Sequence, residues 1–174
     1  MFYIESERLR LIPLNIHQLR IYTQPEVLAE NLGLKAAKVE TEPLFQNEFD
    51  EALQNHWTPL VEKNPDNYVW FTNWLIVQKE ENIAVGGIGV SGLPNEKGEC
   101  ETGYGMDLSH RGKGYATEAL ACLAQWAFKN PDLKAIIAHT FIDGLSSQKV
   151  LQKAGFQYVE AKEGLMLWEL RRGE

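Results

Sequence analysis

Short runs rich in β-branched and aromatic residues recur along this chain and predict β-strands. Arg8 to Ile12 forms the first run, and Pro13 stops it because proline has no backbone N–H to donate to a neighbouring strand. Two later runs are separated only by the polar residues 79–82, which predicts a β-hairpin. Gly103 and Gly105 interrupt a further run and indicate a bulge or the close approach of another backbone. The predicted strands cover 8–12, 68–78, 83–90, 99–107, 133–141, 156–160 and 165–170.

Apolar residues at helical spacing predict the helices. The clearest helix begins after Gly112, where alanines and leucines from 116 to 127 share one face at a period near 3.6, and an Asn-Pro pair ends it. A later helix stops at Gly155, with Ser146 or Ser147 as its cap. Asn15 is placed to cap a short helix, and 15–65 otherwise shows helices and loops without regular spacing. With no repeat or linker, the chain is predicted to be one domain over 1–174, of the α/β (α+β) class.

Composition and charge narrow the function classes. At 174 residues and 44% hydrophobic, the chain is long enough for a real core. Seventeen Lys+Arg against 24 Asp+Glu give a net charge of −7, which argues against general affinity for nucleic acid or an anionic membrane surface and suits a cationic substrate. No apolar run approaches the roughly 18 residues needed to cross a bilayer. Cys100, Cys122 and four scattered histidines match no metal or redox spacing, so we expect a reduced, metal-free, cytoplasmic protein.

One short run has the character of a phosphate site. It lies between a predicted strand and the alanine-rich helix, so its backbone N–H groups belong to the positive end of that helix. Its glycines leave room for a phosphate near the backbone, and its basic side chains add positive charge. A pyrophosphate fits this description. The run consists of Arg111, Gly112, Lys113, Gly114, Tyr115 and Ala116.

Other readings of this run fail or are weaker. A Walker-type loop needs glycine where Asp107 stands, and serine or threonine where Gly114 stands. A dinucleotide fingerprint needs glycine or alanine at Thr117, and it lacks the expected βαβ context. An ordinary strand-to-helix turn stays open if these six residues are considered alone. The remaining phosphate-binding pattern is Gln/Arg-x-x-Gly-x-Gly/Ala, which Arg111, Gly114 and Ala116 meet.

That pattern resembles the acetyl-CoA loop of the GNAT family of N-acetyltransferases. Further stretches in the same order and spacing resemble the family's ribosomal-protein N-acetyltransferase-like branch, whereas 15–65 carries no family landmark. These stretches are Glu5-Ser6-Glu7-Arg8-Leu9-Arg10-Leu11, Glu101-Thr102-Gly103-Tyr104, Tyr115-Ala116-Thr117-Glu118-Ala119 and Val150-Leu151-x-Lys153-x-Gly155-Phe156.

The resemblance implies a mixed, mostly antiparallel sheet of about six or seven strands, with helices on both faces. The strand ending near Asp107 and the strand 133–141 would splay apart to admit the pantetheine arm of acetyl-CoA. Backbone groups around Met106 and Leu108 would pair with that arm, and the Met106 N–H would face the thioester carbonyl as an oxyanion hole. The implied reaction is acetyl transfer from acetyl-CoA to a primary amine, on a protein N-terminus or a small molecule, by direct attack in a ternary complex.

The chain departs from the family at one position. The family's Asn-x-x-Ser falls on Gly144 and Ser147, so the asparagine that contacts the cofactor arm is absent. Asp143 or Ser146 can take its place, and the sequence does not choose between them. Ser147 is the candidate to protonate the leaving thiolate, with a plain helix cap as the equally good structural reading.

The need for a proton acceptor depends on the pKa of the acceptor amine, because only a neutral amine can attack the thioester. At pH 7 an α-amine is about 10% neutral, whereas a lysine amine is neutral only to the order of 0.04%. Glu101 matches the acidic position of the resembled branch and is the first candidate for the base, acting through water; an exposed strand carboxylate is the alternative. Tyr104 is the second catalytic candidate.

Other roles stay open from the sequence. Trp57, Trp70, Phe71 and Trp74 are candidates for an acceptor pocket, although such density usually means core packing. A non-catalytic CoA-binding module or sensor is the main alternative function, and a ligand-free structural partner is a third. A homodimer is also left open.

Overall fold

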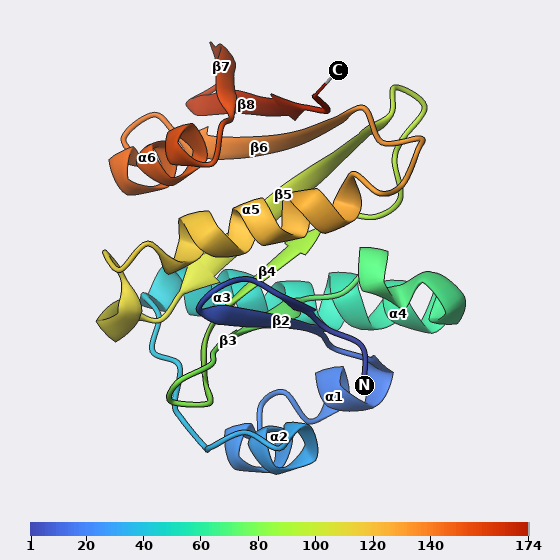
Figure 1. Cartoon of the computed structure of the whole chain (residues 1–174), viewed down its shortest axis with the longest axis vertical. Helices are drawn as coiled ribbons and strands as arrows, with labels where there is room; N and C mark the ends of the chain where they lie inside the picture. Colours follow the sequence, from blue (N-terminus) through green and yellow to red (C-terminus); the bar gives the residue numbers. More distant parts are fainter. Residues whose placement is uncertain (174) are drawn as a thin grey trace.

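A computed structural model describes residues 1–173, and within them eight strands form one sheet (Figure 1). Neighbouring strands are antiparallel except β5 and β6, which are parallel. The sheet order is β1-β2-β3-β4-β5-β6-β8-β7. The strands are β1 (Ile4–Glu5), β2 (Leu9–Pro13), β3 (Trp74–Gln78), β4 (Ile83–Val90), β5 (Glu99–Met106), β6 (Ala135–Phe141), β7 (Gln157–Lys162) and β8 (Leu165–Arg171). The mixed, mostly antiparallel sheet is confirmed, with the short edge strand β1 added to the seven predicted.

Helices cover both faces of the sheet, as predicted. On one face α5 packs against β1, β2, β4 and β5 and touches α6. On the other face lie the helices of the N-terminal third, where α3, the π-helical turn η1 and α4 follow one another without a break. The helices are α1 (Ile16–Arg20), α2 (Pro25–Leu32), α3 (Pro43–Ala52), η1 (Leu53–Trp57), α4 (Thr58–Lys63), the 3₁₀ turns η2 (Pro65–Trp70) and η3 (Leu108–His110), α5 (Tyr115–Ala127) and α6 (Leu145–Lys153).

Strand β3 shows how the sheet divides the core into two layers. All five of its residues are buried, because alternate side chains point to opposite faces and both faces are covered. Trp74 and Ile76 join the cluster under α5, whereas Leu75 and Val77 join the cluster under α1, α2 and α4. The continuous apolar run of β3 therefore reflects burial on two sides.

Two local predictions are wrong in detail. The strand predicted over 68–78 begins at Trp74, because Pro65 starts a 3₁₀ turn that runs to Trp70. The Trp74 indole N–H donates to the Val69 carbonyl (2.8 Å) and holds this turn against the strand. At α6 the cap is Gly144, and both serines lie inside the first turn, because the Gln148 N–H donates to the Gly144 carbonyl (3.1 Å) and starts the helix before them.

The capping prediction for α1 is confirmed. Asn15 accepts a hydrogen bond from the Gln18 N–H (3.0 Å), and the Gln18 side chain accepts one from the Asn15 N–H (3.0 Å), which together form a capping box. Within residues 1–173 no helix is both apolar and long enough to cross a bilayer.

The parallel pairing of β5 with β6 is short. It joins Glu99 to Ala135, Cys100 to Ile136 and Glu101 to Ile137, after which the strands separate (Figure 1). Beyond this point β5 continues to Met106 and β6 to Phe141. The predicted splayed pair is therefore present at the centre of the sheet.

Candidate active site

The predicted phosphate run forms the loop into α5. Gly112 (φ +75°) and Gly114 (φ +81°) both adopt the left-handed conformation that favours glycine, and Gly114 is the N-cap of the helix. A Cβ built on Gly112 would meet no heavy atom within 4 Å, so the backbone there is open to a ligand. The unpaired N–H groups of the first turn of a 13-residue helix give this end a partial positive charge. The loop geometry therefore suits an anion.

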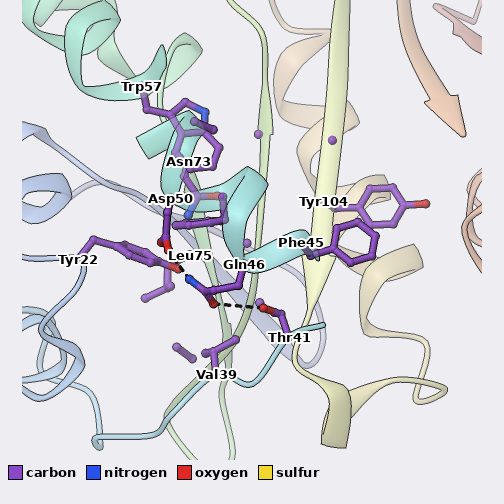
Figure 2. A pocket seen from close by; sticks show the side chains of 18 of the residues that line it. Tyr22, Val39, Thr41, Phe45, Gln46, Asp50, Trp57, Asn73, Leu75 and Tyr104 are labelled. Carbon is purple, nitrogen blue, oxygen red and sulfur yellow. Dashed lines mark hydrogen bonds between the residues drawn. The ribbon is translucent and has the colours of Figure 1, made fainter. Parts of the chain in front are cut away.

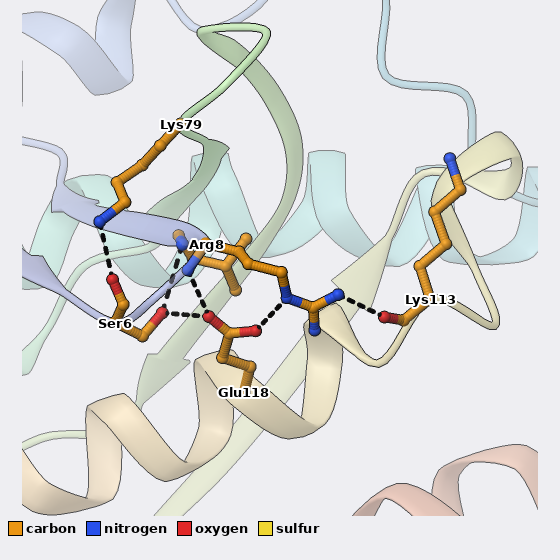
Figure 3. A network of polar contacts seen from close by, with 6 residues as sticks. Ser6, Arg8, Lys79, Lys113 and Glu118 are labelled. Carbon is orange, nitrogen blue, oxygen red and sulfur yellow. Dashed lines mark hydrogen bonds and ion pairs between the residues drawn. The ribbon is translucent and has the colours of Figure 1, made fainter.

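A polar network ties this loop to the N-terminal strands (Figure 3). The Arg8 guanidinium donates to the Lys113 carbonyl (2.9 Å) and to the Glu118 carboxylate (2.7 Å), which also accepts from Ser6 (2.7 Å). Burial alone would raise the pKa of Glu118, but these donors outweigh it and lower that pKa. The Lys113 ammonium points away from the network. The network thus holds the loop backbone, and the Lys113 ammonium takes no part in it.

The other named loop side chains have different surroundings. Arg111 forms an ion pair with Glu42 (2.8 Å), the N-cap residue of α3, so its charge is turned toward that helix. The Arg8 guanidinium lies over the Tyr115 ring, with Cζ of Arg8 4.7 Å from the ring centroid. Ala116 packs against the core cluster beneath α5.

The hydrogen-bond pattern of β5 directs some of its backbone groups into the divergence from β6. The Asp107 N–H donates to the Val85 carbonyl (2.9 Å), so Met106 and Gly86 are a pair without mutual hydrogen bonds. The backbone N–H and carbonyl of Met106 therefore point away from β4. By the same alternation, those of Tyr104 also face the side from which β6 has separated.

The end of β5 is fastened to the segment that precedes α3. The Glu40 N–H donates to the Asp107 carboxylate (2.6 Å), and the Leu108 N–H donates to the Glu40 carbonyl (2.8 Å). The Leu108 N–H therefore has a partner within the chain. Burial would raise the pKa of Asp107, but hydrogen bonds from Ser109, His110 and Glu40 outweigh it and lower that pKa to about 2.

Glu101 lies at the apex of the divergence and pairs with a histidine. Its Oε1 is 2.7 Å from Nδ1 of His139, which lies on β6 two residues beyond the last β5 partner, Ile137. Both side chains are partly exposed, at 46% for Glu101 and 38% for His139. The sequence carried no signal for His139, which appeared only as one of four scattered histidines.

A cavity of ≈ 610 Å³ opens beside Glu101, on the face covered by the N-terminal helices (Figure 2). Gly103 and Gly105 form part of its floor, and a Cβ on either would meet nothing within 4 Å. Of the two predicted explanations for these glycines, the bulge is wrong, because β4 and β5 pair in unbroken register, and no other backbone lies within 4 Å of either Cβ position. These glycines instead leave the strand surface open. The remaining lining is largely apolar and includes Tyr22, Leu28, Leu34, Val39, Phe45, Phe49, Trp57 and Leu75.

Polar side chains also line the cavity, and acidic, basic and amide groups are among them. Asp50 accepts from Gln46 (2.9 Å), and Gln46 Oε1 accepts from the Thr41 hydroxyl (3.2 Å) (Figure 2). Burial, with a smaller contribution from the Asp50 carboxylate, raises the pKa of Tyr22, so that phenol stays neutral. The Nδ2 of buried Asn73 has no hydrogen-bond partner among the described residues.

Only some of the aromatic pocket candidates lie here. Trp57 lines the cavity and packs against Phe49, with ring centroids 4.8 Å apart. Trp70 and Trp74 instead pack against Trp126 of α5, in the core on the other face. Phe71 is partly buried between the two core clusters.

Comparison with known proteins decides the family. The acetyltransferase (GNAT) domain family matches residues 8–157. The chain is 36% identical over 157 residues to the uncharacterized N-acetyltransferase YjdG of Bacillus subtilis, covering 90% of each chain. The protein belongs to the GNAT family. It is accordingly an enzyme of the N-acetyltransferase class.

Solved GNAT structures share the fold. A ribosomal-protein-S5-alanine acetyltransferase from Vibrio fischeri superposes with a TM-score of 0.68 at 20% identity, covering 98% of this chain and 97% of that one. The ribosomal L7/L12 alpha-N-protein acetyltransferase in complex with coenzyme A gives 0.67 at 16% identity, covering 98% of both chains. GNAT acetyltransferases use acetyl-CoA, and these neighbours show that this chain has the fold of such enzymes.

The remaining catalytic candidates of this GNAT chain do not gather around Glu101. Alternation along β5 sends the Tyr104 side chain to the α5 face, where its hydroxyl donates to the Ser147 carbonyl (3.2 Å). Burial raises the pKa of Tyr104 to about 12, against a smaller lowering by this hydrogen bond. Tyr104 and Ser147 therefore meet on one face, and Glu101 lies on the other.

Gly144, at the departure from the family pattern, lies in a tight turn. A Cβ there would come 3.1 Å from the Phe141 carbonyl oxygen, so the position has little room for a side chain. Among residues 1–173, no cluster of three or more His, Cys, Asp or Glu side chains is placed to hold a metal ion. Cys100 and Cys122 are buried free thiols, and burial raises the pKa of Cys100 to about 12.

Proposed function

We propose that this GNAT enzyme uses acetyl-CoA to acetylate the primary amine of a compact acceptor with an apolar body, by direct attack in a ternary complex. The observation that carries the proposal is the placement of the backbone groups of Met106 and Tyr104. They face the divergence of β5 from β6, between the positive end of α5 and the cavity that Glu101 lines. Acetyl-CoA supplies the activated thioester.

The residues around the divergence fit such a ligand. The open backbone at Gly112 and Gly114 receives the pyrophosphate, and Met106 and Tyr104 offer the backbone groups that pair with pantetheine like an added strand. The Met106 N–H is the donor for the negative charge that develops on the carbonyl oxygen, a contribution of a few kcal/mol, about 3. The Leu108 carbonyl adds an acceptor, since its N–H is committed to Glu40.

In this proposal, side chains on both faces of β5 take part in proton transfer. Glu101 receives a proton from the amine, directly or through a water molecule. On the other face the Ser147 hydroxyl is the proton donor to the leaving sulfur, and the Tyr104 hydroxyl supports it by fixing the Ser147 backbone. Arg111 would have to release Glu42 before its charge reached a phosphate.

The cavity defines the acceptor. Its volume, ≈ 610 Å³, falls in the range of small-molecule sites, and its walls are mainly apolar and aromatic. A small amine with an apolar body or the terminal residue of a peptide fits this space. The names of two structural relatives refer to ribosomal-protein amines, so a protein N-terminus belongs among the acceptors to test.

The proposal is tested by following thiol release from acetyl-CoA with a panel of acceptors. The panel holds 2-phenylethylamine, a polyamine, and peptides that begin with an apolar or an acidic residue. We expect the apolar amines to react fastest, because they bury surface against the aromatic walls. Glu101→Gln should lower kcat by about 10²- to 10⁴-fold with little change in CoA affinity.

Glu99→Gln is the matched control, since Glu99 is a carboxylate on the same strand face two residues away. It should keep the parent rate. Tight CoA binding with no thiol release for any acceptor would instead identify a CoA-binding module or sensor. Equal rates for apolar and polar amines would contradict the assigned acceptor class.

A further inference from the structure

The contact between Glu101 and His139 has features beyond those of an ordinary surface ion pair. Exposed pairs of this kind contribute little to stability, so stability alone does not account for its position. The 2.7 Å contact joins two strands at the point where their pairing ends, and Glu101 lines the acceptor cavity. His139 therefore stands behind the carboxylate that faces the acceptor.

The chemistry of the two groups defines their protonation states. An ionised carboxylate only accepts hydrogen bonds, so Nδ1 of His139 must carry a proton in this contact. Nε2 then either carries a second proton or has a free lone pair. The pair thus has two states, of net charge −1 and 0, which differ by one proton.

We propose that His139 is the positioning residue for Glu101, and that the pair together holds the proton taken from the acceptor amine. This inference rests on the proposed function. A hydrogen bond donated to a carboxylate favours its ionised form, and at neutral pH an imidazole holds a proton better than a carboxylate does, so the proton taken by Glu101 passes on to His139. His139 also fixes one carboxylate oxygen and leaves the other for the amine.

The free carboxylate oxygen of Glu101 takes a proton from the ammonium as the N–H bond breaks. Because Nδ1 of His139 already carries a proton, water carries the proton on to Nε2, and the pair goes from −1 to 0. The nitrogen lone pair forms the C–N bond to the acetyl carbon. The C–S bond breaks, its electron pair stays on sulfur, and the sulfur takes the proton of the Ser147 hydroxyl. The nitrogen of the new C–N bond loses its second proton to water, and water returns one proton to Ser147. The pair returns its proton to water before the next turnover.

Other charged groups share the sheet face with this pair. Residues opposite one another in register lie on the same face, which places Glu169 and Arg171 of β8 beside β6, and Glu160 and Lys162 of β7 beyond them. Glu169 and Arg171 form an ion pair (2.8 Å). On β5 the only further titratable side chain of this face within residues 1–173 is Glu99. Across the cavity that Glu101 lines, the N-terminal helices and the segment between α2 and α3 contribute Lys35, Lys38, Glu48, Asp50 and His56. His139 is the histidine in hydrogen-bond contact with Glu101.

The test is the pH profile of kcat between pH 5.5 and 9, at saturating acetyl-CoA and amine, for the parent, His139→Gln and His139→Ala. Glutamine can still donate a hydrogen bond to Glu101 but holds no extra proton, whereas alanine does neither. In the parent we expect kcat to fall on the acid side of neutrality. His139→Gln should lose about tenfold in kcat and this acid fall, while His139→Ala should lose more. CoA affinity should not change.

Two controls separate catalysis from structure. His17→Gln alters an exposed histidine of α1 and should reproduce the parent profile. The double variant Glu101→Gln with His139→Gln should be no slower than Glu101→Gln alone, because the two residues act as one unit. In the ligand-free protein, nitrogen NMR of the imidazoles should show the Nδ1–H form of His139, altered by Glu101→Gln and unaltered by Glu99→Gln.

The outcomes separate the two proposals. Normal turnover in the parent with the parent pH profile in both His139 variants would overturn the role of His139 alone. A parent that turns over no amine would overturn the proposed function and this inference with it.

Discussion

At the scale of single residues, Asp107 joins three parts of the site. Its carboxylate accepts from the Glu40 N–H (2.6 Å), the Ser109 N–H (3.1 Å) and Nδ1 of His110 (2.6 Å). These contacts fasten the segment before α3 to the end of β5. Because the side chain is only 5% exposed, removing the charge leaves several donors without an acceptor.

Asp107→Asn should make stability depend less on pH. The pKa of Asp107 falls from its usual 3.8 to about 2, so the ionised carboxylate stabilises the fold above pH 4 by about 2 kcal/mol. That contribution is lost as pH falls from about 4 to about 2. Urea unfolding at pH 7, 4 and 3 should therefore show a weaker variant at pH 7 and a smaller decline toward pH 3.

The exposed Asp132 provides the control for this prediction. Asp132→Asn should keep the parent dependence on pH. An unchanged slope between pH 4 and pH 3 in Asp107→Asn would show that this carboxylate does not link folding to proton binding.

At the scale of elements, the start of α5 combines two functions in Gly114. Its positive φ ends the loop and begins the helix, and its backbone lies where the anion is proposed to bind. A Cβ there would lie 3.3 Å from Nη2 of Arg8, so the guanidinium would have to give way by a few tenths of an ångström. Strain from φ and loss of anion space are therefore the main effects of a substitution.

Gly114→Val should lose CoA affinity in addition to stability. Valine resists a positive φ, so unfolding should become easier by about 1–3 kcal/mol. Gly164→Val is the matched control, because Gly164 also has a positive φ (+84°) and a Cβ there meets nothing within 4 Å in the β7–β8 turn. Urea unfolding should show a similar loss of stability in the two variants. Calorimetry with CoA should show a loss of CoA affinity only in Gly114→Val. Equal CoA affinity in both would place the pyrophosphate elsewhere.

At the scale of the whole molecule, the sheet consists of two parts joined at its centre. Within residues 1–173, β5 and β6 share three paired positions, and α5, which packs on the first part and touches α6, spans the junction. The Glu101–His139 and Tyr104–Ser147 contacts add side-chain links across it. A ligand bound between the two strands would add contacts to both parts.

CoA should therefore raise the melting temperature, whereas NAD and ATP should raise it much less. All three carry phosphates for the α5 loop, but only CoA carries a pantetheine arm to pair with Met106 and Tyr104. At a hundredfold excess over Kd, CoA should add about 2.7 kcal/mol. For a chain of this size that corresponds to roughly 5–11 °C. Thermal unfolding with each ligand checks this, and equal shifts for all three would contradict specific binding of CoA.

Much of the fold and the conformation of the glycine loop before α5 could be predicted because their signals are local. The α5 face repeats within a few residues, the Asn15 cap contacts a residue three positions away, and the glycines at 112 and 114 mark a loop whose geometry depends on their own φ. The burial of β3 on two faces likewise shows in its unbroken apolar run. Such short-range features can be predicted from a few neighbouring residues, without knowledge of the rest of the chain.

The acceptor side of the site was decided by tertiary structure alone. His139 meets Glu101 across 38 positions because β5 and β6 pair in one register, and a shift by one residue would turn His139 to the other face. The cavity wall comes from the irregularly spaced aromatic residues of 22–57, which only the docking of α2 and α3 onto β4 and β5 brings together. The sequence determined which segments form strands, helices and the glycine loop before α5. Strand register and helix docking, which arise from contacts between distant segments, determined which side chains line the cavity.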